Sequence, residues 1–212
     1  AIPAGVIVGQ FGLLPSVRRE DYTAKPPYLK PASPRLVLKS DHKRRAQQDQ
    51  TMIPIPQLEQ LPLTHRQEIP PEFEDAMGHM NIQWYVHMYG LAAWALFGLF
   101  DITLEHVRQR QEGMFALKQF IEYRREVHIG QTVQIRSRVL GVSARRIHYL
   151  HFMINESSNT LASTFEVLAS YADLDARRTA PFPDNIRATI NDMLAQHQRL
   201  EWAAPVCGIL AP

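Results

Sequence analysis

Two different periodicities meet at one polar turn near residue 75. Ahead of the turn, Leu63, His65, Gln67 and Ile69 occupy every second position, which predicts a strand. Behind it, apolar residues recur at helical spacing and predict a long helix: Tyr85, Met88, Tyr89, Ala92, Ala93, Leu96, Phe97 and Phe100. The rest of the chain is organised around this strand, turn and helix.

The second half of the chain returns to a period of two. Alternating residues predict four further strands, over 115–123, 133–141, 145–155 and 161–173, with residues 101–111 as a short helical or loop connection before them. An amphipathic pattern over 183–200 predicts a terminal helix, with Ile186, Ile190 and His197 on one side. We expect the four strands to form an antiparallel meander.

The long helix is apolar nearly all round, so nearly all of its sides need cover. A curled antiparallel sheet wrapped around a central helix supplies that cover, and this predicts an α+β fold. One copy would leave an edge strand and one end of the helix exposed, so we expect a homodimer or homotetramer.

The turn itself contains the polar groups that could take part in a reaction. Gly78 lets the backbone turn sharply, and Asn81 is a good cap for the helix that follows. Asp75 lies just before that helix, whose first amides carry partial positive charge. A carboxylate beside such amides can bind and attack a carbonyl group. The structural alternative is that Asp75 only caps the helix.

Composition divides the 212 residues into three parts. Residues 1–60 are rich in proline and basic, and we predict an extended, poorly ordered leader; a targeting segment is the alternative. Residues 61–176 hold the predicted sheet and central helix, and residues 177–212 hold the terminal helix and a tail. Residues 1–51 carry a net charge of +5 and the remainder −3, so the basic excess belongs to the leader.

These features disfavour several classes of function. The folded part has no basic excess, which argues against nucleic-acid binding, and no apolar run reaches the roughly 18 residues of a membrane span. Cys207 is the single cysteine, which fits a reducing, cytoplasmic location. No set of histidines has metal-ligand spacing, because His148 and His151 fall on opposite faces of a strand, so we expect no metal site.

The turn also carries a recognisable motif. Asp75-x-x-Gly78-His79-Met80-Asn81-x-x-x-Tyr85 resembles the signature of acyl-CoA thioesterases of the hot-dog fold, the 4-hydroxybenzoyl-CoA thioesterase-like family. Pro70-Pro71-Glu72, Val139-Leu140-Gly141 and Arg146-Ile147-His148 are similar to a subgroup associated with carnitine and betaine catabolism. The resemblance covers residues 62–176 and implies hydrolysis of an acyl-CoA ester, with CoA as part of the substrate and no other cofactor.

The resemblance also implies roles for individual residues. Asp75 would be the general base or nucleophile, with His79 and Asn81 as the other catalytic residues. The candidates for substrate binding are Gly78, Ile82, Trp84, Tyr85 and Tyr89, although aromatics on this helix can equally be core residues. Two departures narrow the mechanism: Ile82 replaces a second Asn, and Tyr89-Gly90-Leu91 lacks the helical Glu of another branch.

Three questions stay open at this point. The same fold could support an enoyl-thioester hydratase or dehydratase using His79 beside Asp75, or a non-catalytic acyl-CoA binder. Arginines that could hold the CoA phosphates lie on predicted strand ends or turns: Arg124, Arg125, Arg136, Arg138, Arg145 and Arg146. An aromatic pocket would suit a quaternary ammonium acyl group such as betaine through cation–π contact.

Overall fold

The computed structural model describes residues 53–212. The elements are α2 (Ile55–Leu58), β1 (Leu63–Glu68), a 3₁₀ turn η2 (Pro71–Phe73), α3 (Ile82–Gly98), α4 (Leu104–Arg110), β2 (Glu112–Tyr123), β3 (Thr132–Val142), β4 (Arg146–Asn155), β5 (Thr160–Asp173), β6 (Arg178–Thr179) and α5 (Asp184–Gln198). The expected strands and both expected helices are present, with bounds that differ by a few residues. The predicted leader lies largely outside the described residues; of its last residues, 55–58 form α2.

The strands form one antiparallel sheet in the order β1-β3-β4-β5-β2, with β6 paired to β5. The expected meander is therefore wrong in one respect, because β2 pairs with β5 and not with β3. The connection over 124–131 explains the difference. It passes beside the start of α3, where the Met80 amide donates to Val127 O (2.8 Å), and places β3 next to β1.

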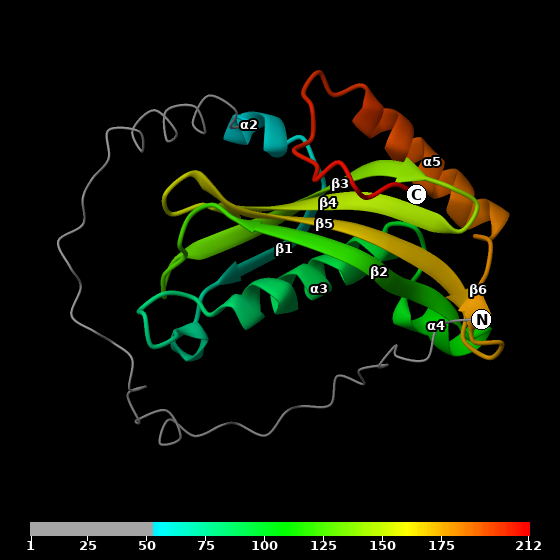
Figure 1. The fold of residues 1–212 in the computed structure, drawn as a ribbon, viewed down its shortest axis with the longest axis horizontal. Coiled ribbons are helices and arrows are strands. Elements are labelled where there is room, and N and C mark those ends of the chain that lie inside the picture. The colour runs from blue at the N-terminus through cyan, green and yellow to red at the C-terminus, as the bar shows by residue number, and fades with distance from the viewer. Residues whose placement is uncertain (1–52) are drawn as a thin grey trace. The chain divides into compact units, whose positions relative to one another are not determined.

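Helix α3 lies against one face of this sheet (Figure 1). Tyr85, Met88, Tyr89, Ala92 and Leu96 form the buried side of the helix and pack into the main core. The expectation that nearly all sides are covered is wrong for the single chain, because the sheet covers the helix from one side only. Large apolar residues remain exposed on α3: Ile82, Val86, Leu91 and Trp94.

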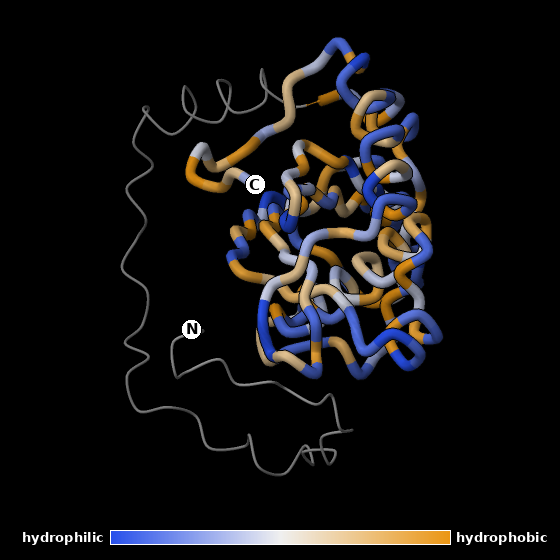
Figure 2. The backbone as a smooth tube through the Cα atoms, turned by 90° about the vertical axis from the view of Figure 1, so that its right-hand side faces the viewer, coloured by the Kyte–Doolittle hydropathy of each residue, from blue (hydrophilic) through white to orange (hydrophobic). Residues whose placement is uncertain are grey.

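The opposite face of the sheet is covered by α2 and the C-terminal tail (Figure 1). Helix α5 runs beside β3, where the Val139 amide donates to His197 Nδ1 (2.9 Å), and its Ile186 and Ile190 side chains belong to the main core. The tail carries a hydrophobic stretch near its end (Figure 2). The Arg138 guanidinium lies 4.1 Å from the centre of the Trp202 ring and donates to His197 O (3.0 Å). The buried Glu166 carboxylate accepts hydrogen bonds from His148 Nε2 (2.8 Å) and the Cys207 amide (2.6 Å). These contacts hold the tail on the sheet.

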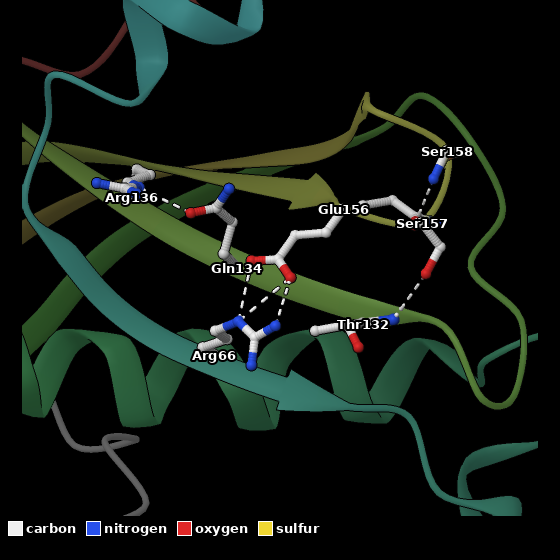
Figure 3. Close-up of polar contacts among 8 residues, drawn as sticks. Arg66, Thr132, Gln134, Arg136, Glu156, Ser157 and Ser158 are labelled. Atoms are coloured by element: carbon white, nitrogen blue, oxygen red, sulfur yellow. Dashed lines mark hydrogen bonds and ion pairs between the residues drawn. The ribbon is translucent and has the colours of Figure 1, made fainter.

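Polar contacts also tie β1 to the turn between β4 and β5 (Figure 3). Arg66 donates from Nε (3.0 Å) and a terminal nitrogen (2.7 Å) to the Glu156 carboxylate. The Thr132 amide donates to Ser157 Oγ (3.1 Å). The Arg66–Glu156 pair is largely exposed, so we expect it to contribute little to stability. Together the two contacts hold β1 and β3 beside this turn.

Acid should destabilise the fold through His151, which is fully buried. Burial lowers the pKa of His151 from 6.5 to about 3. Between these values the unfolded chain binds more protons, so the free energy of unfolding falls as the pH drops from 6.5 towards 3 and is unaffected above 6.5. The slope from one such group is at most about 1.4 kcal/mol per pH unit. Urea unfolding of the wild type and His151→Gln should show a flatter acid limb in the variant; equal slopes would contradict this.

Candidate active site

The signature residues form a tight hairpin between β1 and α3. The Asn81 amide donates to Phe73 O (2.9 Å), Glu74 pairs with Met80 in a short antiparallel bridge, and the Asp75 amide donates to His79 O (3.0 Å). At the tip, the Gly78 amide donates to Asp75 O (3.1 Å) and Gly78 has a φ of +84°. A turn closed by a residue in the left-handed region is a common hairpin loop, with Asp favoured first and Gly last. Local turn chemistry thus accounts for the Asp-x-x-Gly spacing.

The Asp75 carboxylate faces two ways. Its Oδ1 accepts a hydrogen bond from the Met77 amide (2.8 Å), and its Oδ2 lies 3.5 Å from His79 Nδ1. The side chain is 15% exposed, so it is accessible but largely enclosed. Asp75 does not cap α3, because Asn81 Oδ1 accepts from the Gln83 amide (3.0 Å) and fills that role. Asp75 orders its own turn and keeps Oδ2 directed to His79.

One amide at the start of α3 is left free by these contacts. The Asn81 amide is bonded to Phe73 O and the Gln83 amide to Asn81 Oδ1. The amide of Ile82, between them, has no hydrogen-bond partner among residues 53–212, and the Ile82 side chain is 62% exposed. A free amide at the N-terminus of a 17-residue helix is well suited to polarise a carbonyl oxygen.

Aromatic side chains from α3 flank the hairpin. Trp84 stacks on Phe73 with ring centres 3.9 Å apart, and its buried indole N–H has no partner in the described part of the chain. Tyr85 meets Tyr123 of β2 edge to face at 5.1 Å. Burial raises the pKa of Tyr85 to about 12, and the nearby Asp75 charge adds a smaller increase. Tyr85 therefore stays protonated beside the carboxylate.

Tyr89 is further from the turn, in the core. Its ring is fully buried, stacks on Phe165 with centres 4.8 Å apart, and its hydroxyl is 2.5 Å from Ser163 Oγ. The structure thus brings Asp75, Gly78, His79, Asn81 and Ile82 together in one turn, with Trp84 and Tyr85 one helical turn beyond. It places Tyr89 away from them.

The loop between β2 and β3 adds residues that the sequence analysis did not single out. His128 Nδ1 donates to Gly78 O (3.1 Å), and His128 Nε2 lies 3.7 Å from the Glu126 carboxylate. The Glu126 charge also contributes to the raised pKa of Tyr85. Nothing in the sequence pattern signals this proximity, because the loop is about 50 residues away along the chain.

Five of the six candidate arginines lie in three different environments. Arg136 donates to the carbonyls of Glu59 and Leu61, and Arg138 is held by the tail, so both support the outer layer of the fold. Arg124 pairs with Glu122 at 2.9 Å. Arg145 and Arg146 are exposed at the turn between β3 and β4.

A cavity of about 420 Å³ lies elsewhere, between the start of β1 and α5. Leu61, Arg136 and His197 are among its lining residues. Asp75 follows the other end of β1, and a six-residue strand is about 20 Å long. This cavity is therefore separate from the hairpin.

Neither a metal centre nor a membrane span is found in the described residues. No group of three His, Cys, Asp or Glu side chains there could hold a metal ion. Within residues 53–212, no helix combines the length and the apolar character needed to cross a bilayer.

Gly78 should be intolerant of a side chain because of its backbone conformation. A Cβ at this position meets no atom within 4 Å, so the cost is the strain of φ +84° and not a clash. Gly78→Ala should lower the free energy of unfolding by about 1–2 kcal/mol. Gly90→Ala is the matched control: Gly90 is exposed and helical, so alanine should stabilise by up to about 1 kcal/mol. Chemical denaturation measures both, and equal effects would contradict the assignment.

Comparison with known proteins gives this geometry a context. Residues 69–190 match the thioesterase-like superfamily. The chain belongs to that superfamily. A betainyl-CoA thioesterase from Pseudomonas aeruginosa is 24% identical over 143 residues, which are 68% of this chain and 90% of that protein. An L-carnitine dehydrogenase/betainyl-CoA thioesterase from Agrobacterium fabrum is 27% identical over 135 residues, 63% of this chain and 27% of the longer protein.

Solved structures share the fold. A Staphylococcus aureus protein in complex with CoA superposes with a TM-score of 0.65 at 21% identity, covering 72% of this chain and 96% of that one. A 1,4-dihydroxy-2-naphthoyl-CoA thioesterase from Synechocystis gives 0.55 at 16% identity, covering 62% and 96%. The hot-dog fold and the thioesterase resemblance expected from the sequence are confirmed.

Proposed function

We propose that this member of the thioesterase-like superfamily hydrolyses acyl-CoA esters to free CoA and a carboxylic acid, with Asp75 at the centre of the site. The observation that carries the proposal is the pairing of a carboxylate, Asp75, with the unbonded amide of Ile82 at the start of α3. Thioester hydrolysis needs a base or nucleophile and a donor for the developing oxyanion. The hairpin and the start of α3 supply both the carboxylate and the amide donor, seven residues apart.

Each group has a defined part in this proposal. Asp75 Oδ2 either takes a proton from the attacking water or attacks the thioester carbonyl itself. His79, 3.5 Å from Oδ2, orients the carboxylate, and Asn81 holds the end of α3 in place. The Ile82 amide and the helix dipole stabilise the oxyanion. CoA is part of the substrate, and no other cofactor is required.

A second copy of the chain completes the site. Strand β2 ends the sheet, and three large residues along it are exposed: Leu117, Phe120 and Tyr123. Tyr123 touches Tyr85 beside Asp75, so a partner on this edge would also cover the site. We therefore propose a homodimer, alone or within a homotetramer, that works in the cytoplasm.

The names of two relatives and the aromatic residues near the hairpin suggest which acyl group to test first. Two relatives are named for betainyl-CoA, and the aromatic rings of Trp84, Tyr85 and Tyr123 near the hairpin would suit its quaternary ammonium group. Betainyl-CoA is accordingly the first ester to test.

A hydratase is the alternative reaction. It would use His79 and Asp75 as a pair between which a proton could move.

Product analysis tests the proposal. The wild-type chain is incubated with short, branched, aromatic, betainyl and 2-enoyl CoA esters, and the products are identified by mass spectrometry. Free thiol and free acid in equal amounts support hydrolysis. A hydrated ester without free thiol supports the hydratase, and an ester that binds but stays intact supports a binding protein.

A further inference from the structure

The cavity between the start of β1 and the end of α5 combines an apolar wall with polar groups. Its volume is about 420 Å³. Apolar side chains line it from two segments that are far apart in the sequence: Leu61, Leu63, Met193 and Leu200. Arg136 of β3 and His197 of α5 also line it. Cavities that bind small molecules have this size and this mixture of an apolar lining with a few polar groups.

Arg136 has two donors that the protein does not use. A guanidinium carries five N–H donors. In Arg136, Nε donates to Gln134 Oε1 (2.9 Å; Figure 3), and Nη1 donates to Glu59 O (3.0 Å) and Leu61 O (2.8 Å). Within residues 53–212 Nη2 makes no hydrogen bond, so both of its protons are available to a ligand. The three existing bonds hold the guanidinium in place beforehand.

His197 supplies a further donor. Its Nδ1 accepts from the Val139 amide (2.9 Å), and burial, together with the nearby charge of Arg138, lowers the pKa of His197 to about 4. At ordinary pH the ring is therefore neutral and carries its one proton on Nε2. His197 is 6% exposed, and its Nε2 has no hydrogen-bond partner in the described part of the chain. Because buried donors normally have an acceptor and His197 lines the cavity, we expect that acceptor to come from a ligand.

The positive charge beside this cavity is not balanced by a carboxylate. Arg136 donates only to uncharged oxygens. Arg138, two residues along β3, is 8% exposed and donates to Trp202 O (2.9 Å) and His197 O (3.0 Å). Across residues 53–212, neither guanidinium forms an ion pair with Asp or Glu. Buried charges are usually paired, so the cavity should attract an anion and disfavour a cation.

We propose that this cavity binds a small organic carboxylate, which accepts hydrogen bonds from Arg136 Nη2 and His197 Nε2 and packs its apolar body against the leucine and methionine side chains. An inorganic anion would use the donors but not the apolar lining, and an amine would meet the unbalanced charge of Arg136. The inference does not depend on the proposed thioesterase function, because the cavity is separate from the hairpin. Its tests accordingly measure binding and not turnover.

Calorimetry with the wild-type chain measures the preference. Hexanoate is the probe, and hexylammonium, hexanol and inorganic phosphate are the comparisons. Hexanoate should bind at least about tenfold more tightly than each of the other three, because charge-assisted hydrogen bonds are the stronger kind and only hexanoate uses both parts of the cavity. Equal binding of phosphate or of hexanol, or no binding of hexanoate, would overturn the inference.

Nitrogen NMR spectra show where hexanoate binds. A carboxylic acid is also the product of the proposed reaction, so it could bind at the hairpin as well. The ring nitrogens of His197 report on the cavity, and the backbone amide of Gly78 reports on the hairpin. Hexanoate should shift the His197 signals, whether or not Gly78 responds. A shift at Gly78 alone would mean that the acid binds only at the hairpin, against the inference.

Two variants alter the cavity in different ways. Leu63 is 49% exposed, so Leu63→Trp should fill the cavity without disturbing the core and weaken hexanoate binding by about tenfold or more. Arg136→Gln removes the guanidinium and should make hexanoate bind no more tightly than hexanol. Arg66→Gln is the matched control, because it removes an arginine that bonds Glu156 at the other end of β1 and should leave hexanoate binding unchanged. Circular dichroism checks the fold, and wild-type affinity in a folded Leu63→Trp variant would overturn the inference even if Arg136→Gln does not fold.

Discussion

Asp75→Asn lowers kcat for thioester hydrolysis by about 10²- to 10⁴-fold, the usual cost of removing a general base. The substitution leaves the hairpin intact, because the amide oxygen of Asn can still accept from the Met77 amide as Asp75 Oδ1 does. What it removes is the charge and basicity of Oδ2, the atom that faces His79. The loss should appear mainly in kcat, since the Ile82 amide and the aromatic residues are unchanged.

The control is Asp101→Asn at the other end of α3. Asp101 is exposed and has a φ of 62°, a conformation that Asn adopts readily. Asp101→Asn removes the same charge as Asp75→Asn, at an exposed position away from the hairpin. It should leave kcat within about twofold of the wild-type value, because surface substitutions usually have small effects. Circular dichroism confirms that both variants fold. Equal activity of Asp75→Asn and wild type would return Asp75 to a structural role in its turn.

Placing lysines on the free edge of β2 should separate the proposed dimer and remove most of the activity. Leu117 and Phe120 are 46% and 43% exposed on this strand, and charged side chains on an edge prevent a second strand from pairing there. Leu117→Lys with Phe120→Lys should lower the mass in light scattering from that of the wild-type oligomer towards that of a single 24.3-kDa chain. Because Tyr123 of the same strand touches Tyr85 beside Asp75, the loss of order at the site should lower thiol release by about 10²-fold.

Leu99→Lys provides the comparison for this variant. Leu99 is 48% exposed at the C-terminal end of α3, where a positive charge is favourable, so it tests the effect of a lysine away from β2. This variant should keep both the mass and the activity of the wild type. A wild-type chain that is monomeric at working concentration, yet fully active, would refute the role of the β2 edge.

The local sequence pattern predicted the helices and strands well, but it predicted less well which strands pair and which helix faces are covered. Alternation identified the strands, and Asn81 marked the start of α3, because a helix cap is a property of a few adjacent residues. The pairing of β2 with β5 depends on the path of residues 124–131 around the start of α3, which no local pattern encodes. Apolar character all round α3 predicted full cover, yet Val86 and Trp94 are exposed in the single chain.

The candidate site shows the same division. Asp75, Gly78, His79 and Asn81 are close in sequence, so the motif alone placed them in one turn. Tyr89 was grouped with them because it shares the helix, but seven residues from Ile82 carry it into the core. His128 follows β2 in the sequence, about 50 residues after Gly78, and only the folded chain shows that the two are in contact.

The hydrogen bonds of His151 could not be predicted from the sequence either. The alternation of β4 indicates that His151 faces the core, but it does not show that Nε2 is left without a partner among the described residues while Nδ1 is bonded. That depends on Ser137 and Thr64, which are brought beside His151 by β3 and β1.

The most direct test of the central claim is the rate of free-thiol release from a panel of CoA esters, betainyl-CoA included, by the wild-type chain. We predict that at least one ester releases thiol and acid in equal amounts, faster than in its absence and in proportion to protein. Esters that bind to the protein and remain intact across the panel would contradict the claim that Asp75 and the start of α3 form a thioesterase site.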